Sequence, residues 1–164
     1  MIDLARITPL VETLAEALRT RGLKLATAES CTGGLIAAAC TSIAGSSDWF
    51  ERGYETYSNA AKTEMLGVEA ALIAAHGAVS EPVVRAMADG ALARSGADLA
   101  LAVTGIAGPG GAVPGKPVGT VWLAWARRGA AVQAERVHFD GERTAVRAQT
   151  VVLALQRALA LARA

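Results

Sequence analysis

The 164-residue chain is poor in aromatic residues, in cysteine and in net charge. Aromatic residues make up 4% of it and charged residues 19%, and the 16 Lys and Arg nearly balance the 15 Asp and Glu, which leaves a formal charge of +1. A charge this close to zero provides no general attraction to nucleic acid or to an anionic membrane. A local anion site remains compatible with it.

Only two cysteines occur, Cys31 and Cys40, and they make neither a disulfide framework nor a zinc-ligand pattern. No uninterrupted apolar run approaches the ~18 residues that span a bilayer. The first ten residues, MIDLARITPL, lack the basic and apolar regions of a signal peptide. These absences predict a cytoplasmic protein with reduced thiols, and they indicate no metal and no cofactor.

Hydrophobic residues make up 52% of the sequence, which indicates a globular chain with a core, and residues 1–164 are expected to form one domain. Helical and strand patterns alternate along the chain, with no internal repeat. Thr8 and Pro9 predict the start of the first helix, and Gly22 predicts its end. The last helix is expected to start near Asp140. In it, apolar residues recur at helical spacing, namely Ala148, Val152, Leu155 and Leu159.

Five segments read as strands: LKLATA, GYETYS, ADLALAVTG, GTVWLAWAR and AVQAERVHFD. The third and fourth are nearly continuous apolar runs, typical of strands covered on both faces, whereas the fifth alternates and suits an edge. The pattern predicts a single-domain α/β fold, a three-layer α/β/α sandwich with about five strands. Because the last three strands follow one another with short turns, we expect a mixed sheet.

The segment TAESCTGG, from Thr27 to Gly34, concentrates polar side chains between two apolar runs. Ser30 is expected at or just before a helix N-terminus, where backbone N–H groups favour negative charge and could stabilise an oxyanion. It could be a nucleophile or an ordinary helix N-cap. Cys31 could attack instead, although a small buried thiol is the commoner state of cysteine. Glu29 could be an acid, a substrate contact or a structural acceptor.

A serine nucleophile needs a base, and the sequence contains only two histidines, His76 and His138. Neither accompanies an acid motif, so a Ser-His-Asp triad is not favoured. Lys62 falls in the first turn of a predicted helix, where the helix dipole opposes a cation, and burial would further favour its neutral form. Taken alone, a solvent-exposed lysine is the commoner reading. Tyr57 could relay a proton or be an ordinary strand aromatic.

A glycine-rich loop, TGIAGPGGAVPGKPVG, begins at Thr104 and suits backbone contact with a ligand, although an ordinary long connection fits equally well. Its GGAVPGKP segment matches part of a P-loop. Pro117 replaces the required Ser or Thr and a strand follows, which excludes that reading. Arg143 and Arg147 lie on one face near a predicted helix start. They could clamp a phosphate or belong to a solvated face with Glu142.

Read together, the segments TAESCTGG, GYETYSNAAKTEMLGV, HGAVSEPVV, AVTGIAGPGG and KPVGTVWLAW closely resemble the CinA C-terminal domain family, in the family's order and over nearly the whole chain. The resemblance implies hydrolysis of nicotinamide mononucleotide to nicotinic acid mononucleotide and ammonia. It also implies that Ser30 is the nucleophile, Lys62 its base and Tyr57 an assisting hydroxyl. The expected substrate contacts are Glu29, Thr32, Gly33, Gly34, Tyr54, Thr104, Gly105, Gly108, Arg143 and Arg147.

Two positions depart from the family pattern: Gly115 stands where an acidic residue is usual, and Glu55 where an apolar one is usual. Longer members carry a further N-terminal domain associated with pyrophosphatase activity, so none of that activity is expected here. The competing hypothesis is a catalytically idle nucleotide-binding or partner-binding domain, and the presence of both Ser30 and Lys62 favours the enzyme. The expected partners are the nucleotide and further copies of the chain, a homo-oligomer with a dimer favoured, and neither nucleic acid nor a membrane.

Overall fold

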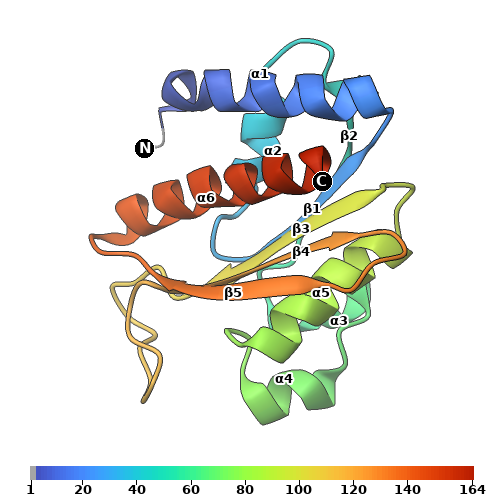
Figure 1. The fold of residues 1–164 in the computed structure, drawn as a ribbon. Coiled ribbons are helices and arrows are strands. Elements are labelled where there is room, and N and C mark those ends of the chain that lie inside the picture. Colours follow the sequence, from blue (N-terminus) through green and yellow to red (C-terminus); the bar gives the residue numbers. More distant parts are fainter. Residues whose placement is uncertain (1–2) are drawn as a thin grey trace.

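The computed structural model describes residues 3–164 and shows a five-stranded sheet between two layers of helices (Figure 1). The strand order is β2-β1-β3-β4-β5. The strands are β1 (Leu25–Glu29), β2 (Phe50–Glu55), β3 (Leu99–Gly105), β4 (Thr120–Arg127) and β5 (Gln133–His138). β1 pairs in parallel with β2 and β3, whereas β4 is antiparallel to both β3 and β5. The predicted three-layer sandwich with a mixed sheet is confirmed.

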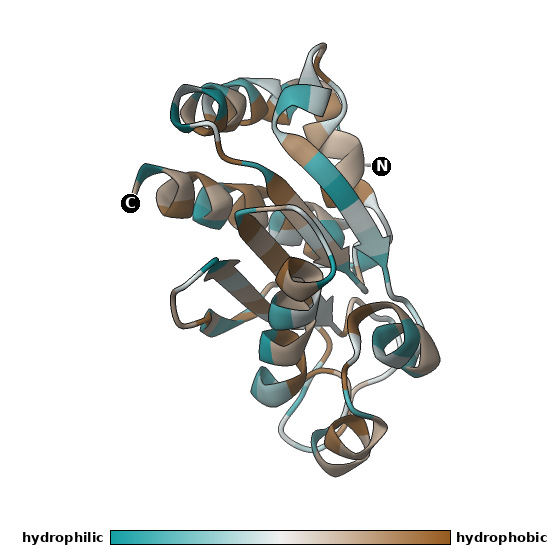
Figure 2. Ribbon diagram, turned by 90° about the vertical axis from the view of Figure 1, so that its right-hand side faces the viewer, coloured by the Kyte–Doolittle hydropathy of each residue, from teal (hydrophilic) through white to brown (hydrophobic). Residues whose placement is uncertain are grey.

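Six α-helices cover the two faces of the sheet within residues 3–164 (Figure 1). One face carries α1 (Leu4–Arg21), α2 (Leu35–Cys40) and α6 (Arg143–Arg163), and the other carries α3 (Asn59–Leu66), α4 (Ala70–His76) and α5 (Glu81–Ala93). β1 is buried throughout and β3 almost throughout, as expected of strands covered on both faces, whereas β5 is a partly exposed edge. Figure 2 shows a matching pattern of hydropathy: the central strands are brown, which marks hydrophobic residues, and teal, which marks hydrophilic ones, appears on the outer parts of the helices.

The first helix begins earlier than the Thr8-Pro9 pair predicts. α1 starts at Leu4, directly after Asp3, whose carboxylate accepts a hydrogen bond from Ala5 N. Thr8 is not a cap, because its hydroxyl donates to Leu4 O inside the helix. A carboxylate at the positive end of a helix is a strong cap, and it outweighs the local Thr-Pro signal. The predicted end is confirmed: a glycine with φ 62° closes the helix.

The predicted last helix is α6, and its apolar residues at helical spacing differ in burial. Leu155 is buried, whereas Ala148, Val152 and Leu159 are partly buried. The buried residues are Val146, Thr150, Val151, Ala154, Leu155, Ala158 and Ala162. α6 is apolar on more than one face, and spacing alone does not select the face that meets the sheet. By length and composition it is also the one helix of residues 3–164 that could cross a membrane, and here it packs against α1, β3 and β4.

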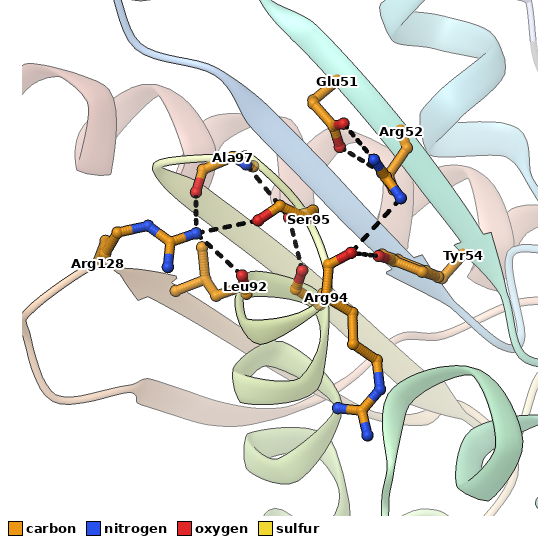
Figure 3. A network of polar contacts seen from close by, with 9 residues as sticks. Glu51, Arg52, Tyr54, Leu92, Arg94, Ser95, Ala97 and Arg128 are labelled. Atoms are coloured by element: carbon orange, nitrogen blue, oxygen red, sulfur yellow. Dashed lines mark hydrogen bonds and ion pairs between the residues drawn. The ribbon is translucent and has the colours of Figure 1, made fainter.

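The C-terminal end of α5 is held by side chains from β2 and from the residue after β4 (Figure 3). Tyr54 Oη donates to Arg94 O at 2.7 Å, and the Arg128 guanidinium donates to three more carbonyls around this end. The last carbonyls of a helix have no partner within it, and a cation is favoured there. Tyr54, expected to be a substrate contact, belongs to this network.

A close contact between α3 and α5 depends on Gly90. A Cβ built on Gly90 would lie 2.1 Å from Leu66 O, so the two helix backbones approach to a distance that only glycine permits. α3 buries Leu66 and Lys62. The contact therefore sets how deeply α3 places Lys62 in the protein.

We expect Gly90→Ala to destabilise the fold and Gly96→Ala to leave it nearly unchanged. In an unobstructed helix the alanine would be favoured by about 1 kcal/mol. At Gly90 its methyl group would collide with a backbone oxygen, and overpacking of this kind costs roughly 1–3 kcal/mol. Gly96 is the matched control, because no atom lies within 4 Å of its Cβ position. Chemical unfolding followed by circular dichroism measures both, and a Gly90→Ala protein as stable as wild type would contradict the contact.

Candidate active site

A cavity of about 230 Å³ lies at the carboxyl ends of β1 and β3, where ligands bind in open α/β sheets. Ser30, Lys62, Thr104 and Arg143 contribute to its wall. A larger cavity, about 390 Å³, lies along α6, but its wall consists of apolar residues and two glutamines and holds no acid, base or nucleophile. In residues 3–164, no three His, Cys, Asp or Glu side chains lie together as metal ligands would. The smaller cavity is the one that brings together the predicted nucleophile Ser30 and the predicted base Lys62.

Ser30 is the first residue of the turn that joins β1 to α2. The turn is closed by a hydrogen bond from Gly33 N to Ser30 O at 3.1 Å, and Gly33 and Gly34 adopt φ of 57° and 87°, the left-handed region that favours glycine. α2 begins only at Leu35, with Gly34 as its N-cap. Ser30 is therefore not the cap of this helix, which was the alternative to its catalytic role.

The side chain of Lys62 reaches Ser30 through the interior. Its Nζ lies 3.0 Å from Ser30 Oγ and donates to Thr56 O at 2.7 Å and to Tyr57 O at 3.4 Å, and only 1% of the residue is exposed. Burial lowers the pKa of Lys62 below its ordinary value. No carboxylate of residues 3–164 forms an ion pair with it.

This arrangement suits a neutral amine. A neutral amine has two N–H groups and one lone pair, and the carbonyls of Thr56 and Tyr57 can take the two hydrogens. The lone pair is then free to accept the hydroxyl hydrogen of Ser30. The structure thus brings together the two residues that the sequence proposed as nucleophile and base, and it shows Lys62 buried rather than exposed.

Cys31 lines the same cavity, but its thiol is poorly suited to attack. The residue is 6% exposed, and a Cβ on Gly105 would lie 3.1 Å from its Sγ. Burial raises the pKa of the Cys31 thiol to about 12. Because the thiolate is the reactive form of cysteine, almost none of it is present at neutral pH. The alternative of a cysteine nucleophile is thereby disfavoured.

Glu29 and Thr32 do not reach the cavity. The Glu29 carboxylate is fully buried, and it accepts hydrogen bonds from Thr32 Oγ1 at 2.6 Å, Ile36 N at 3.0 Å and Ala37 N at 2.8 Å. All three partners belong to the turn after Ser30 or to the start of α2. Of the three roles that the sequence left open for Glu29, this geometry is that of a structural acceptor.

The two arginines of α6 occupy different places. Arg143 lines the cavity and donates to Gly108 O at 3.1 Å and to Tyr57 Oη at 3.0 Å. Arg147 lies outside the cavity wall, and it donates to two backbone carbonyls of the turn after Ser30 at 3.1 and 2.9 Å. Of these two arginines, Arg143 is therefore the one that offers a cation to a molecule in the cavity.

Thr104 and Gly105, at the end of β3, line the cavity, and Thr104 Oγ1 donates to Ala78 O at 3.0 Å. Sequence reasoning missed the other wall residues, which are Asn59, Ala78, Val79 and Ala107. The small apolar residues carry no chemical signal. The sequence identified Asn59 only as a residue at the start of a helix, and it is indeed the first residue of α3.

Glu55, one of the two departures from the family pattern, lies beside the turn that carries Ser30. Its carboxyl group is 3.5 Å from the Cβ position of Gly34, and the residue pairs in register with Glu29. Burial, together with the negative charge of Glu29, raises the pKa of Glu55 to about 7.

Residues 7–162 match the CinA C-terminal domain family, and the chain belongs to that family, as the sequence motifs predicted. Nicotinamide-nucleotide amidohydrolase PncC of Pseudomonas putida is 57% identical over 155 residues, which cover 94% of this chain and 96% of that protein. PncC of Escherichia coli K12 is 52% identical over 152 residues, 93% of this chain and 92% of that protein. The crystal structure of competence/damage inducible protein CihA from Agrobacterium tumefaciens matches with a TM-score of 0.91 and 48% identity, over 94% of each chain.

We expect both cysteines of the native protein to resist thiol reagents at pH 8. Cys31 and Cys40 are buried, and burial raises the pKa of each thiol. Ellman's reagent should therefore titrate no thiol in the folded protein and two after unfolding. Rapid reaction of one thiol in the folded protein, lost in Cys31→Ala, would show an accessible thiolate and return Cys31 to consideration as the nucleophile.

Proposed function

We propose that the protein is a nicotinamide-nucleotide amidohydrolase, which converts nicotinamide mononucleotide to nicotinic acid mononucleotide and ammonia. The observation that carries the proposal is the buried Lys62 Nζ, 3.0 Å from Ser30 Oγ, at a cavity that also presents Arg143. These groups supply a nucleophile, a base and a cation for an anionic substrate. The PncC relatives support the same substrate class.

In the proposed reaction Lys62 accepts the Ser30 proton as Ser30 Oγ forms a bond to the carboxamide carbon. The C–N bond then breaks, Lys62 returns the proton to the leaving nitrogen, and ammonia departs from an acyl-serine ester. A water molecule, deprotonated by Lys62, then adds to the ester carbon. The bond from that carbon to Ser30 Oγ breaks, Lys62 returns the proton to Ser30 Oγ, and nicotinic acid mononucleotide leaves. The amine of Lys62 thus transfers protons in both acylation and deacylation, which agrees with its contact with the Ser30 hydroxyl.

Substrate orientation follows from the positions of the charged groups. The carboxamide must reach Ser30 beside the buried Lys62, which leaves the 5′-phosphate for Arg143. Tyr57 is 63% exposed, and its hydroxyl accepts a hydrogen bond from Arg143, so we assign Tyr57 an assisting role through that arginine. The remaining proposed contacts are Thr104, Gly105 and Gly108. An idle binding domain would keep the cavity without turnover, and the intact Ser30–Lys62 pair favours the enzyme.

Purified protein incubated with nicotinamide mononucleotide should release ammonia, and Ser30→Ala should lower kcat by roughly a thousandfold or more, as loss of a covalent nucleophile does in other hydrolases. Lys62→Arg keeps a cation but cannot accept a proton at working pH, so it should be nearly as inactive as Lys62→Ala. If the Ser30→Ala protein still releases ammonia at the wild-type rate, the mechanism is rejected. If Lys62→Arg retains most of the rate, Lys62 contributes only its positive charge and is not the base.

The pH dependence gives a second check on Lys62. Because burial lowers its pKa, the neutral and active fraction rises with pH through that lowered value, and kcat should rise with it and then level off. Glu55, with a pKa of about 7, is a second titrating group nearby, so Glu55→Gln is measured in parallel. A rise that persists in Glu55→Gln belongs to Lys62, and a rise that disappears there belongs to Glu55.

Arg143→Ala should raise KM for nicotinamide mononucleotide by about tenfold or more, because a charge-assisted hydrogen bond to the phosphate is lost. Nicotinamide riboside, which lacks the phosphate, is the control substrate and should be affected much less. Arg147→Ala should instead lower kcat for both substrates in similar proportion, since its donors hold the turn of Ser30. Equal effects of Arg143→Ala on both substrates would make Arg143 a structural residue.

A further inference from the structure

Glu29 is a fully buried carboxylate that directly precedes Ser30 and takes no part in the proposed reaction. Burial of a charged group is costly unless hydrogen bonds satisfy it. Here three donors do so, the Thr32 hydroxyl and the amides of Ile36 and Ala37. The carboxylate thereby joins the end of β1 to the start of α2 across the turn that contains Ser30.

Hydrogen bonds to the backbone of Glu29 also connect this residue, through Thr56, to Lys62, the proposed base. Glu29 O accepts hydrogen bonds from Thr56 N at 2.8 Å and from Thr56 Oγ1 at 3.3 Å, and Thr56 O accepts one from Lys62 Nζ at 2.7 Å. Since Lys62 Nζ contacts Ser30 Oγ, a closed ring of contacts connects Ser30, Glu29, Thr56 and Lys62. The distance between nucleophile and base therefore depends on where residue 29 is held.

The turn that contains Ser30 is also held by hydrogen bonds from α6. Arg147 donates to Cys31 O at 3.1 Å and to Thr32 O at 2.9 Å, so Thr32 is bonded through its hydroxyl to Glu29 and through its carbonyl to Arg147. Contacts from two separate elements fix one short turn, and that turn carries the nucleophile. Thr32 is the residue at which both meet.

We propose that Glu29 is a positioning residue, whose carboxylate, acting through Thr32 and the start of α2, holds the turn that presents Ser30 to Lys62. The inference rests on the proposed function, because it assigns a role within the same Ser30–Lys62 site. It replaces the substrate contact that the sequence suggested for Glu29 and Thr32. A displacement of a reacting group by about 1 Å can lower a rate by roughly a hundredfold, so a loss of this support should appear in kcat.

Two substitutions remove the support in different ways. Thr32→Val deletes only the hydroxyl that donates to Glu29, and Thr32→Ser keeps it. Glu29→Gln keeps the shape but places an amide donor where the carboxylate accepts from backbone N–H groups. Thr13→Val is the matched control, because Thr13 lies in α1 and its hydroxyl donates to Pro9 O, outside the Glu29 network. If Glu29→Gln does not fold, the threonine series is sufficient.

Two readouts are needed. The first is steady-state kinetics with nicotinamide mononucleotide, which separates kcat from KM. The second is the rate at which phenylmethanesulfonyl fluoride modifies Ser30, followed by intact mass. In that reaction Ser30 Oγ forms a bond to sulfur as the S–F bond breaks, the proton passes to Lys62 and fluoride leaves. This readout requires the Ser30–Lys62 geometry but no nucleotide.

Thr32→Val and Glu29→Gln should lower kcat and the labelling rate together by about tenfold or more, with KM within about twofold of wild type. Thr32→Ser should retain more of both rates than Thr32→Val, and Thr13→Val should match wild type. Unchanged kcat, or a raised KM with unchanged kcat, would overturn the proposal, and the latter would make Glu29 and Thr32 substrate contacts. If wild type releases no ammonia from the nucleotide, the proposed function fails, and the labelling rates alone decide whether Glu29 positions Ser30.

Discussion

The proposed site depends on the burial of an amine, that of Lys62, which has no carboxylate partner among residues 3–164. An unpaired ammonium in a protein interior is costly, so the fold favours the neutral form of Lys62. Lys62 Nζ donates to two backbone carbonyls and lies 3.0 Å from Ser30 Oγ. Burial of a lysine usually lowers the stability of a protein. In the proposed reaction the same desolvation favours Lys62 as the base, a task for which many hydrolases use histidine.

The surrounding fold maintains that contact. Parallel pairing of β1 with β2 brings Ser30 beside the segment whose carbonyls receive Lys62, and the close approach at Gly90 seats α3 against α5. Glu29 and Arg147 both hold the turn that begins at Ser30. Several polar groups around the cavity are therefore bonded within the protein itself. Arg143, which lines the cavity, also donates to Gly108 O and to Tyr57 Oη.

Several features were predictable from the sequence because they depend on local pattern. Alternating helical and strand periodicities predicted the mixed α/β sandwich, and the ordered motifs predicted the family, both of which are confirmed. The predicted start of α1 was wrong, because the charged cap at Asp3 outweighs the local signal of Thr8 and Pro9. The buried face of α6 could not be read from the sequence, because that helix is apolar on several faces. The expected homo-oligomer stays a prediction.

The sequence by itself determined the fold class, the family and the identity of the two residues proposed for catalysis, because strand and helix periods and motif order are properties of neighbouring residues. Only the tertiary structure decided which polar side chains face the cavity. Lys62 and Ser30 are 32 positions apart, and Arg147 lies 116 positions from Cys31, whose carbonyl it holds. Burial, and the partners that distant segments bring, decide whether an arginine binds a substrate or a backbone carbonyl. They also decide whether a lysine is exposed and charged or buried and neutral. No local sequence pattern encodes either of them.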